Sequence, residues 1–344
     1  MAIKEAAVAA ALPDQFTEDN SWLVQAIDPG ARLARLLKVD REAIRDSSFL
    51  DDRFLLTKPE AILCDLDQLV EQTRSIDVPP AGWIFHIGHV GSTLVSRLIG
   101  ELEGVSCLRE PRSLRDLSVA TDGERPVLAS ALGRAMARRS NSDRLVTVKA
   151  TSFVSEYASL LAAPGSSALF LYATPQNYIS GILAGENSVK ELAALASLRA
   201  ARLASRGIRL DGFDRDDAHR AAAAWACEMT SLEAAANSMP GQPILWADFD
   251  RMLEDMPVWL ARTTAHFGLE VPSDELSGLA TGPLMRRYSK ALEYDYSPSL
   301  RAELLAEAGR DHLCQINEAV VALHEAAKTA PLLDRALRRA AGEI

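Results

Sequence analysis

Between residues 83 and 249 the chain alternates short, nearly continuous apolar runs with longer stretches that have helical patterning. Apolar strands without a polar face, separated by helices, are typical of a parallel sheet that is covered on both sides. The pattern therefore predicts an α/β fold with a central parallel β-sheet flanked by helices. The five predicted strands are 83–87 (WIFHI), 104–108 (GVSCL), 144–150 (RLVTVKA), 167–173 (SALFLYA) and 243–249 (PILWADF).

Residues 1–80 are predicted to form a mostly helical N-terminal accessory segment, because their apolar positions recur at helical spacing. The Pro-Pro of DVPPAG (77–82) cannot continue a helix and marks the boundary with a main domain over 81–344. The stretches interpreted as helical are NSWLVQAI, PGARLARLLKV, DREAIRDS and PEAILCDLDQLVEQTRSI, the last with Ile62, Leu66, Leu69 and Val70 on one face.

Two further regions of the main domain are predicted to be helical. The Ala- and Leu-rich stretch 186–238 is interpreted as a helical insert between the fourth and fifth strands, and the tail from about 299 as C-terminal helices. Trp225, Trp246 and Trp259 are assigned to the core, and His86 to a buried structural role within the first strand of the sheet.

The sequence FHIGHVGSTLVSRLIG (85–100) predicts a strand, a tight glycine turn and an amphipathic helix. Gly88 and Gly91 permit turn conformations that bring backbone N–H groups close to an anion. Ser92 and Thr93 add hydroxyl donors at the helix N-terminus, where the helix dipole favours negative charge. We interpret the loop as an anion site; the alternative is an ordinary helix N-cap. The phosphate-loop pattern G-x-x-x-x-G-K-[ST] is not satisfied.

Composition and charge narrow the possible functions. The chain has 344 residues, of which 48% are hydrophobic and 24% charged, and a formal net charge of −10, which disfavours a general nucleic-acid binder. Its 4 cysteines show no metal-binding spacing, and we expect reduced thiols and no metal site. No 18-residue apolar stretch occurs, so we expect no membrane span and a cytoplasmic protein.

HIGHVGSTLVSRLI resembles the 5′-phosphosulfate loop of the sulfotransferase family, in a divergent bacterial form. The resemblance implies a P-loop NTPase-like sulfotransferase fold and 3′-phosphoadenosine 5′-phosphosulfate (PAPS) as co-substrate. It implies that Gly88, Gly91, Ser92 and Thr93 hold the phosphosulfate. His89 falls at the position of the family's lysine, and Arg97 at that of its helix arginine.

Other segments resemble the family in the same order along the chain. CLREPRSLRD (107–116) places Glu110 at the position of the base that deprotonates the acceptor, and VTVKATS (146–152) places Lys149 at a strand end beside it. The alternative to these functional roles is structural: Glu110 would only pair with Arg109 or Arg112, and Lys149 would only form a salt bridge.

The 3′-phosphate segment of the family resembles LFLYATPQNYISGIL (169–183), where Pro175 matches and Ser180 lies within one residue of the expected serine. The family arginine is replaced by Ala173. In the segment LMRRYSKALEYDYS (284–297), which resembles the C-terminal basic loop of bacterial members, the candidates to replace it are Arg286, Arg287 and Lys290.

The resemblance implies transfer of a sulfuryl group from PAPS to a hydroxyl or amine, with Glu110 as base and no metal. A sugar, lipid, peptide or small phenol remains open as acceptor. Two alternatives remain. One is a phosphotransferase that uses a nucleoside triphosphate and Mg²⁺, with Asp248 as the candidate metal ligand. The other is a non-catalytic nucleotide-binding or interaction protein that keeps only the fold.

Overall fold

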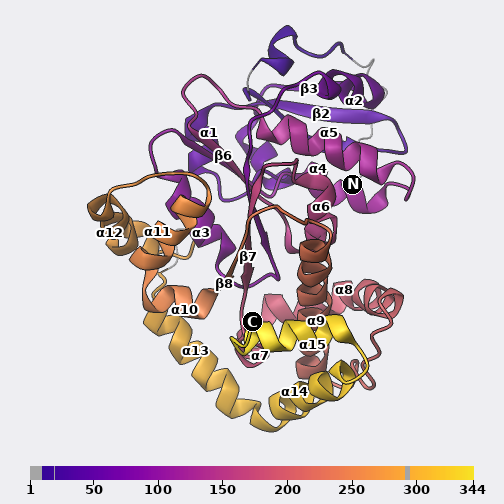
Figure 1. Cartoon of the computed structure of the whole chain (residues 1–344), viewed down its shortest axis with the longest axis vertical. Coiled ribbons are helices and arrows are strands. Elements are labelled where there is room, and N and C mark those ends of the chain that lie inside the picture. The colour runs from indigo at the N-terminus through magenta and orange to yellow at the C-terminus, as the bar shows by residue number, and fades with distance from the viewer. Residues whose placement is uncertain (1–9, 19, 291–294) are drawn as a thin grey trace.

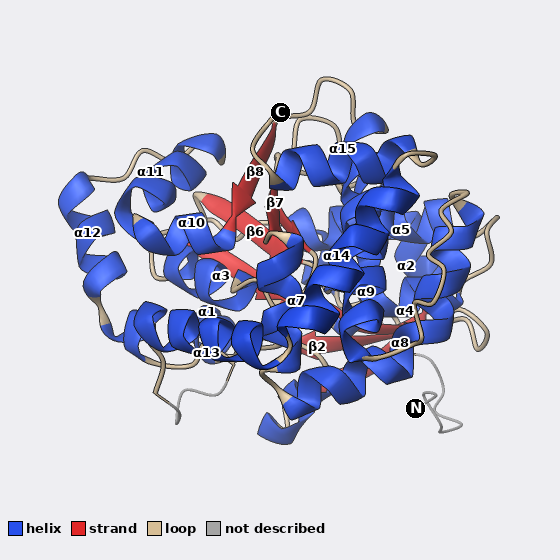
Figure 2. Cartoon of the chain, turned by 90° about the horizontal axis from the view of Figure 1, so that it is seen from below, coloured by secondary structure: helices blue, strands red, loops and turns tan. Residues whose placement is uncertain are grey.

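The computed structural model describes residues 10–18, 20–290 and 295–344, and its centre is a five-stranded parallel sheet. The strand order is β5-β6-β4-β7-β8, and helices lie on both sides of the sheet (Figure 2). All five predicted strands, and the α/β fold with a central parallel sheet, are confirmed. Their bounds are β4 Gly82–His86, β5 Val105–Arg109, β6 Leu145–Lys149, β7 Ser167–Tyr172 and β8 Ile244–Asp248.

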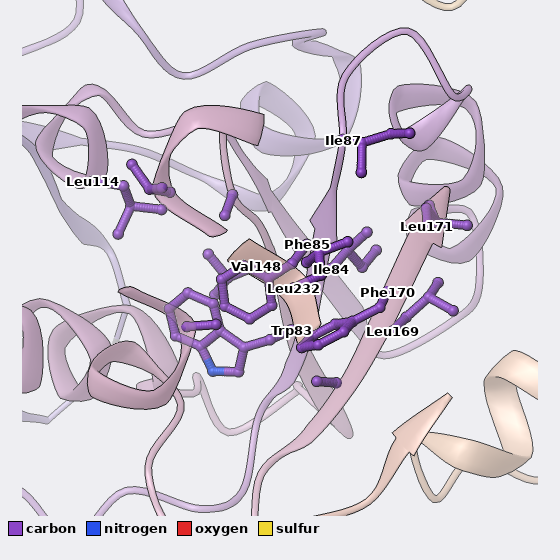
Figure 3. Packing of buried hydrophobic residues seen from close by; sticks show 14 of the residues in the cluster. Trp83, Ile84, Phe85, Ile87, Leu114, Val148, Leu169, Phe170, Leu171 and Leu232 are labelled. Atoms are coloured by element: carbon purple, nitrogen blue, oxygen red, sulfur yellow. The ribbon is translucent and has the colours of Figure 1, made fainter. Parts of the chain in front are cut away.

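The middle strand β4 pairs with β6 on one side and β7 on the other, and every residue of β4 is buried. Trp83 stacks on Phe85 with ring centroids 5.6 Å apart, and Phe85 meets Phe170 of β7 edge-on at 5.8 Å. Figure 3 shows these rings with aliphatic side chains of β6 and β7 packed around them. Burial of the sheet on both faces explains why its strands have no polar face.

Residues 20–80 contain a second, antiparallel sheet, which the sequence interpretation missed. The helices predicted over NSWLVQAI and PGARLARLLKV are wrong: these stretches form the strands β1 (Trp22–Asp28) and β2 (Leu33–Lys38), and β3 (Ala61–Asp65) completes the order β1-β2-β3. Strand β1 packs against α4 and α5 and is buried along most of its length, so its apolar run fitted a buried helix equally well.

Helix α1 (Arg41–Asp46) confirms the helix predicted over DREAIRDS, and α2 (Leu66–Arg74) confirms the second half of the one predicted over PEAILCDLDQLVEQTRSI. The first half of that prediction is wrong, because Ala61–Asp65, with Ile62, form β3. Figure 1 shows β2, β3, α2 and α5 together at the end of the molecule opposite the C-terminal helices. Residues 1–9 and 19 of the predicted accessory segment lie outside the described residues.

The predicted insert is confirmed as two long helices, α8 (Glu186–Ser205) and α9 (Asp217–Asn237), between β7 and β8. The C-terminal helices are also confirmed, as α13 (Pro298–Asp311), α14 (Leu313–Ala327) and α15 (Pro331–Ala340). Helix α9 packs against α7, α8, α14 and α15 and buries Trp225 completely, with its indole N–H donating to the Ala173 carbonyl at 2.9 Å.

The remaining helices connect the strands or extend the edge beyond β8. The bounds of these helices are α3 Ser92–Gly100, α4 Arg112–Asp116, α5 Arg125–Ala137, α6 Ala158–Leu161, α7 Pro175–Leu183, α10 Phe249–Glu254, α11 Met256–His266 and α12 Ser273–Thr281, with short 3₁₀ helices at Asp14–Thr17, Asp52–Thr57, Leu117–Val119, Ser152–Tyr157 and Pro283–Arg286. None of the helices in the described ranges has the length and apolar character that a membrane span requires.

Candidate functional site

A cavity of about 860 Å³ lies at the carboxyl edge of the central sheet, where β4, β5 and β6 end. Open parallel sheets bind ligands at this edge, because the loops that follow the strands converge there. Helices α7, α8 and α13 supply further walls. Nine of the site residues predicted from the sequence line this one cavity: Gly88, His89, Gly91, Ser92, Thr93, Glu110, Lys149, Arg287 and Lys290.

The loop after β4 makes a tight turn that brings the first turn of α3 to the cavity. Gly88 and Gly91 have φ values of +83° and +60°, a region that favours glycine. A Cβ atom on Gly91 would lie 1.9 Å from Cζ of Phe249, so the close approach of this ring also requires glycine. The turn therefore presents the N-terminus of α3 to the cavity, as an anion site needs.

The Thr93 hydroxyl provides a test of whether an anion fits here. Thr93 is 1% exposed, and its Oγ1 has no hydrogen-bond partner among the described residues. The N-cap of α3 is Gly91, which has no side chain to satisfy the free N–H groups of the first turn. Buried polar groups are nearly always hydrogen-bonded. A sulfate or phosphate oxygen in the cavity would accept from these donors, so the residues present fit such a group.

Glu110 and Lys149 form an ion pair at the ends of the neighbouring strands β5 and β6. The Lys149 side chain is 1% exposed, and burial lowers its pKa while the Glu110 carboxylate acts in the opposite direction. The backbone N–H of Glu110 donates to the Lys149 carbonyl at 2.8 Å, which holds the two residues in register. Glu110 has a φ of +51°, which is uncommon for a residue with a side chain.

His89 belongs to the glycine loop, also has a positive φ (+54°), and contacts helices α7 and α8 with its side chain. Its Nδ1 is 3.4 Å from the Ser188 hydroxyl, and its Nε2 is 3.7 Å from a carboxylate oxygen of Glu191. Its ring lies edge-on to Tyr178 of α7, with centroids 6.5 Å apart. The contact with His89 lowers the pKa of Glu191. The sequence interpretation missed Ser188 and Glu191, although their spacing of three places them on one helix face.

Basic side chains border the same cavity. Lys290 lines the cavity with His86 and Lys149; burial lowers the pKa values of both groups, and the charge of Lys290 adds a smaller effect in the same direction. Arg287 pairs with Asp295 at 3.2 Å, and Arg301 of α13 pairs with Asp250 at 2.7 Å. The lining side chains that carry positive charge, apart from Lys149, are Arg53, Arg115, Arg287, Lys290 and Arg301.

Three predicted binding residues lie elsewhere. Arg97 is buried beneath the site, and its guanidinium donates to the Ser289 carbonyl at 3.0 Å and the Ser48 hydroxyl at 2.7 Å. Ser180 is buried in α7 outside the lining, and Arg286 is exposed beside a second cavity of about 390 Å³. Residues 291–294 of the predicted basic loop lie outside the described residues.

The N-terminal segment contributes lining residues that no sequence pattern pointed to: Phe49, Asp51 and Arg53. The fully buried Arg109 anchors this stretch, because its guanidinium donates to the carbonyls of Ile44, Arg45 and Ser47, the last two at 2.8 Å. The N–H of Leu50 returns a hydrogen bond to the Arg109 carbonyl at 2.7 Å. Phe49 then lies beside Lys149, whose Nζ is 5.9 Å from the ring centroid.

Two titratable residues near the sheet edge have structural partners. Asp248, the candidate magnesium ligand, caps α10 by accepting from the N–H groups of Asp250 (2.9 Å) and Arg251 (3.4 Å), and it does not line the cavity. His86 is buried as predicted; its Nδ1 accepts from Gly88 N–H at 3.0 Å, and its Nε2 lies 2.9 Å from the Ala150 carbonyl. The described ranges contain no group of three or more side chains able to hold a metal.

No protein-family model matches the sequence, and no curated protein matches it. The fold is similar to that of solved sulfotransferase structures. A sulfotransferase domain from the curacin biosynthetic pathway shares 11% identity at a TM-score of 0.41, over 67% of this chain and 90% of that one. A sulfotransferase domain from the Synechococcus PCC 7002 olefin synthase shares 12% at 0.38, over 66% and 87%.

Mouse sulfotransferase SULT7A1, solved in complex with PAP, shares 13% identity at a TM-score of 0.42, over 78% of this chain and 92% of that one. Similarity at this level concerns the fold alone. The functional proposal therefore depends on the residues of this chain's own cavity.

Proposed function

We propose that this protein is a sulfotransferase that moves a sulfuryl group from PAPS to a hydroxyl group. The observation that carries the proposal is the pairing of two features in one cavity. One is the unpartnered Thr93 hydroxyl in the glycine loop at the N-terminus of α3. The other is the Glu110–Lys149 pair at the adjoining strand ends, a carboxylate and an ammonium group beside the anion cradle.

In this proposal the 5′-phosphosulfate occupies the cradle of Gly88, Gly91, Ser92 and Thr93. Free N–H groups and the helix dipole favour its negative charge. Ala173, at the position of the family arginine, is fully buried with its carbonyl held by Trp225, so it offers nothing to the 3′-phosphate. The basic groups that line the cavity in the 286–290 loop are Arg287 and Lys290, and we assign the 3′-phosphate to them.

The transfer is a single displacement at sulfur. The Glu110 carboxylate accepts the proton of the acceptor hydroxyl while the oxygen attacks sulfur. The bond from sulfur to the bridging phosphate oxygen breaks, and 3′-phosphoadenosine 5′-phosphate (PAP) leaves with the electron pair. Lys149 and His89 stabilise the charge that develops on that oxygen. The positive φ of both His89 and Glu110 agrees with this assignment, since backbone strain concentrates at functional sites.

The base role is tested by Glu110→Gln, which keeps the shape of the side chain and removes its basicity. We expect turnover of PAPS to fall roughly 10²- to 10⁴-fold, while PAP binding measured by calorimetry changes little. Glu103→Gln, on the exposed loop before β5, is the matched control and keeps full activity. Unchanged turnover in Glu110→Gln would remove Glu110 from the mechanism.

A further inference from the structure

Part of the cavity has an apolar lining that the proposed chemistry does not use. Large aliphatic side chains approach it from two helices, α8 and α13, and several remain solvent-exposed: 43% for Leu198, 39% for Leu300 and 43% for Leu304. Single exposed leucines are ordinary on protein surfaces, but their convergence on one cavity marks a binding surface. We call this region the apolar compartment; its members are Phe153, Leu195, Leu198, Leu300, Leu304 and Leu305.

Helical spacing produces the two walls. On α8, Leu195 and Leu198 follow Ser188 and Glu191 along one face, at intervals of three and four residues. On α13, Leu300 and Leu304 are four residues apart and share a face. The residues of both faces line the cavity, so the walls belong to one binding space.

Helix α7 forms the floor between these walls. Both α8 and α13 pack against α7, and Figures 1 and 2 place α7 between them. Gly181 of α7 and Ala184, which directly follows the helix, line the cavity with little or no side chain, so α13 can approach closely. Leu305 of α13 lies against Gly181, since a Cβ there would be 3.4 Å from its Cδ2.

The apolar compartment adjoins the charged part of the cavity at His89. The His89 ring contacts Tyr178 of α7 and approaches Ser188 and Glu191 of α8, which precede the leucines on the same face. A molecule in the compartment therefore reaches His89 and the glycine loop with one end. Its other end lies among leucines, where an unpaired polar group would be costly to bury.

We propose that the acceptor is an uncharged alcohol or phenol with an apolar body, seated between α8 and α13 with its hydroxyl toward Glu110. This inference rests on the proposed function. The leucine walls disfavour a sugar, whose hydroxyls would lose water without gaining partners. On the α13 wall the Arg301 guanidinium is paired with Asp250 at 2.7 Å, and on the α8 wall the Glu191 carboxylate borders the compartment, so an anionic acceptor would gain little there. The product is the sulfate monoester of the alcohol.

The test is a series of 1-alkanols, from 1-butanol through 1-hexanol to 1-octanol, as acceptors with PAPS. We expect kcat/KM to rise about fourfold for each added methylene, the effect of burying one CH₂ group. Leu195→Ser and Leu304→Ser should flatten this dependence. Leu313→Ser is the control: Leu313 is 56% exposed on α14 and does not line the cavity. Equal kcat/KM along the series would overturn the inference.

A binding measurement separates this inference from the proposed function. The neutral fluorescent probe N-phenyl-1-naphthylamine should bind without PAPS and be displaced by the alkanols in order of length, more weakly in the two serine variants. PAP binding by calorimetry reports on the donor site separately. Alkanol displacement without PAP binding would overturn the sulfotransferase proposal and keep the apolar ligand site.

The reverse result, PAP binding with a probe signal unaffected by the serine substitutions, would overturn the inference and leave the proposed function standing. Phosphatidylcholine vesicles test a second occupant. Vesicle binding that both serine variants lose, with no chain-length dependence for soluble alcohols, would overturn the inference by making the leucines a membrane contact.

Discussion

Gly91 is the residue on which the shape of the anion cradle depends most. Its φ is +60°, and the ring of Phe249 occupies the space where a side chain would begin. Phe249 follows β8, whereas the loop follows β4, so this contact joins the cradle to the far edge of the sheet. Any side chain at position 91 must displace either the ring or the loop.

Gly91→Ala is therefore expected to destabilise the protein by about 3 kcal/mol or more, through positive-φ strain together with the clash. The matched control is Gly212→Ala, where φ is +68° but nothing lies within 4 Å of the new Cβ. That variant should lose about 1 to 2 kcal/mol, from strain alone. Urea unfolding of both variants measures the difference, and equal losses would contradict the assigned role of the Phe249 contact.

Glu191 is expected to hold the His89 ring, since its carboxylate lies 3.7 Å from Nε2. Glu191→Gln should lower kcat between about 10- and 100-fold through misplacement of the ring, with PAP affinity unchanged. Glu186→Gln on the same helix is the control, because its partner Lys190 is exposed and the pair is solvent-screened. A loss of PAP affinity equal to the loss in kcat would show that Glu191 supports donor binding instead.

At the residue scale, the loop glycines carried a local signal, and the resemblance to the sulfotransferase family pointed to Glu110 and Lys149. All of them line one cavity. The sequence could not identify Phe49 or Glu191, whose place in the cavity depends on how distant segments pack. Arg97 shows the converse. Its position in the helix suggested a ligand contact, but the backbone carbonyl of Ser289 takes up its guanidinium instead.

Helix α8, which carries one of the proposed acceptor walls, is joined to α9 by a buried charge cluster. Glu228 of α9 is fully buried, and neither carboxylate oxygen has a hydrogen-bond partner in the described chain. Nε of Arg199 on α8 lies 3.7 Å from one of these oxygens. Arg202 and Arg206 pair instead with Glu156, at 3.0 Å and 3.1 Å. Burial raises the pKa of Glu228 to about 7, with the three arginines acting in the opposite direction.

This cluster predicts a pH dependence of stability. Between the ordinary pKa of 4.5 and the folded value of about 7, the folded protein keeps a proton that the unfolded chain releases. The free energy of unfolding therefore falls as pH rises through this window and stays low above it. Glu228→Gln should raise stability at pH 8 by up to roughly 3 kcal/mol, and the gain should vanish near pH 4.

Thermal unfolding at pH 4, 6 and 8 measures this effect, with Glu318→Gln as the control at a surface pair with Arg215. A lower Tm for Glu228→Gln than for the unmodified protein at pH 8 would mean that the carboxylate is ionised and held by Arg199.

At the element scale, the five central strands were predictable because continuous apolar runs alternated with long helical patterns. Strands β1 and β2 were not, since seven and six residues with mixed patterning fit a short helix as well as a strand. Pairing of β1 with β2 and packing against α4 and α5 decided the outcome. Those contacts are tertiary, so no local pattern carries them.

The cavity is a property of the whole molecule, because segments far apart in the chain form it. They are residues 49–53, the loop and strand ends at 88–94 and 110–153, helices α7 and α8, Phe249 after β8, and residues 287–305 on either side of the undescribed 291–294. Arg97 and Arg109 hold the first of these to the sheet through backbone carbonyls. The glycine loop, the segment 169–183 and the basic loop 284–297 carried motifs that resemble the sulfotransferase family, whereas no pattern pointed to residues 49–53.

The proposed donor site is tested by calorimetric titration of the protein with PAP and, separately, with ATP and Mg²⁺. We expect PAP to bind and ATP–Mg²⁺ not to bind. We also expect Thr93→Val to weaken PAP binding about tenfold, because it removes the unpartnered hydroxyl donor of a residue that lines the cavity. Binding of ATP–Mg²⁺ alone would indicate a phosphotransferase, and binding of neither would indicate a protein that keeps the fold without the donor site. Either result would contradict the proposed function.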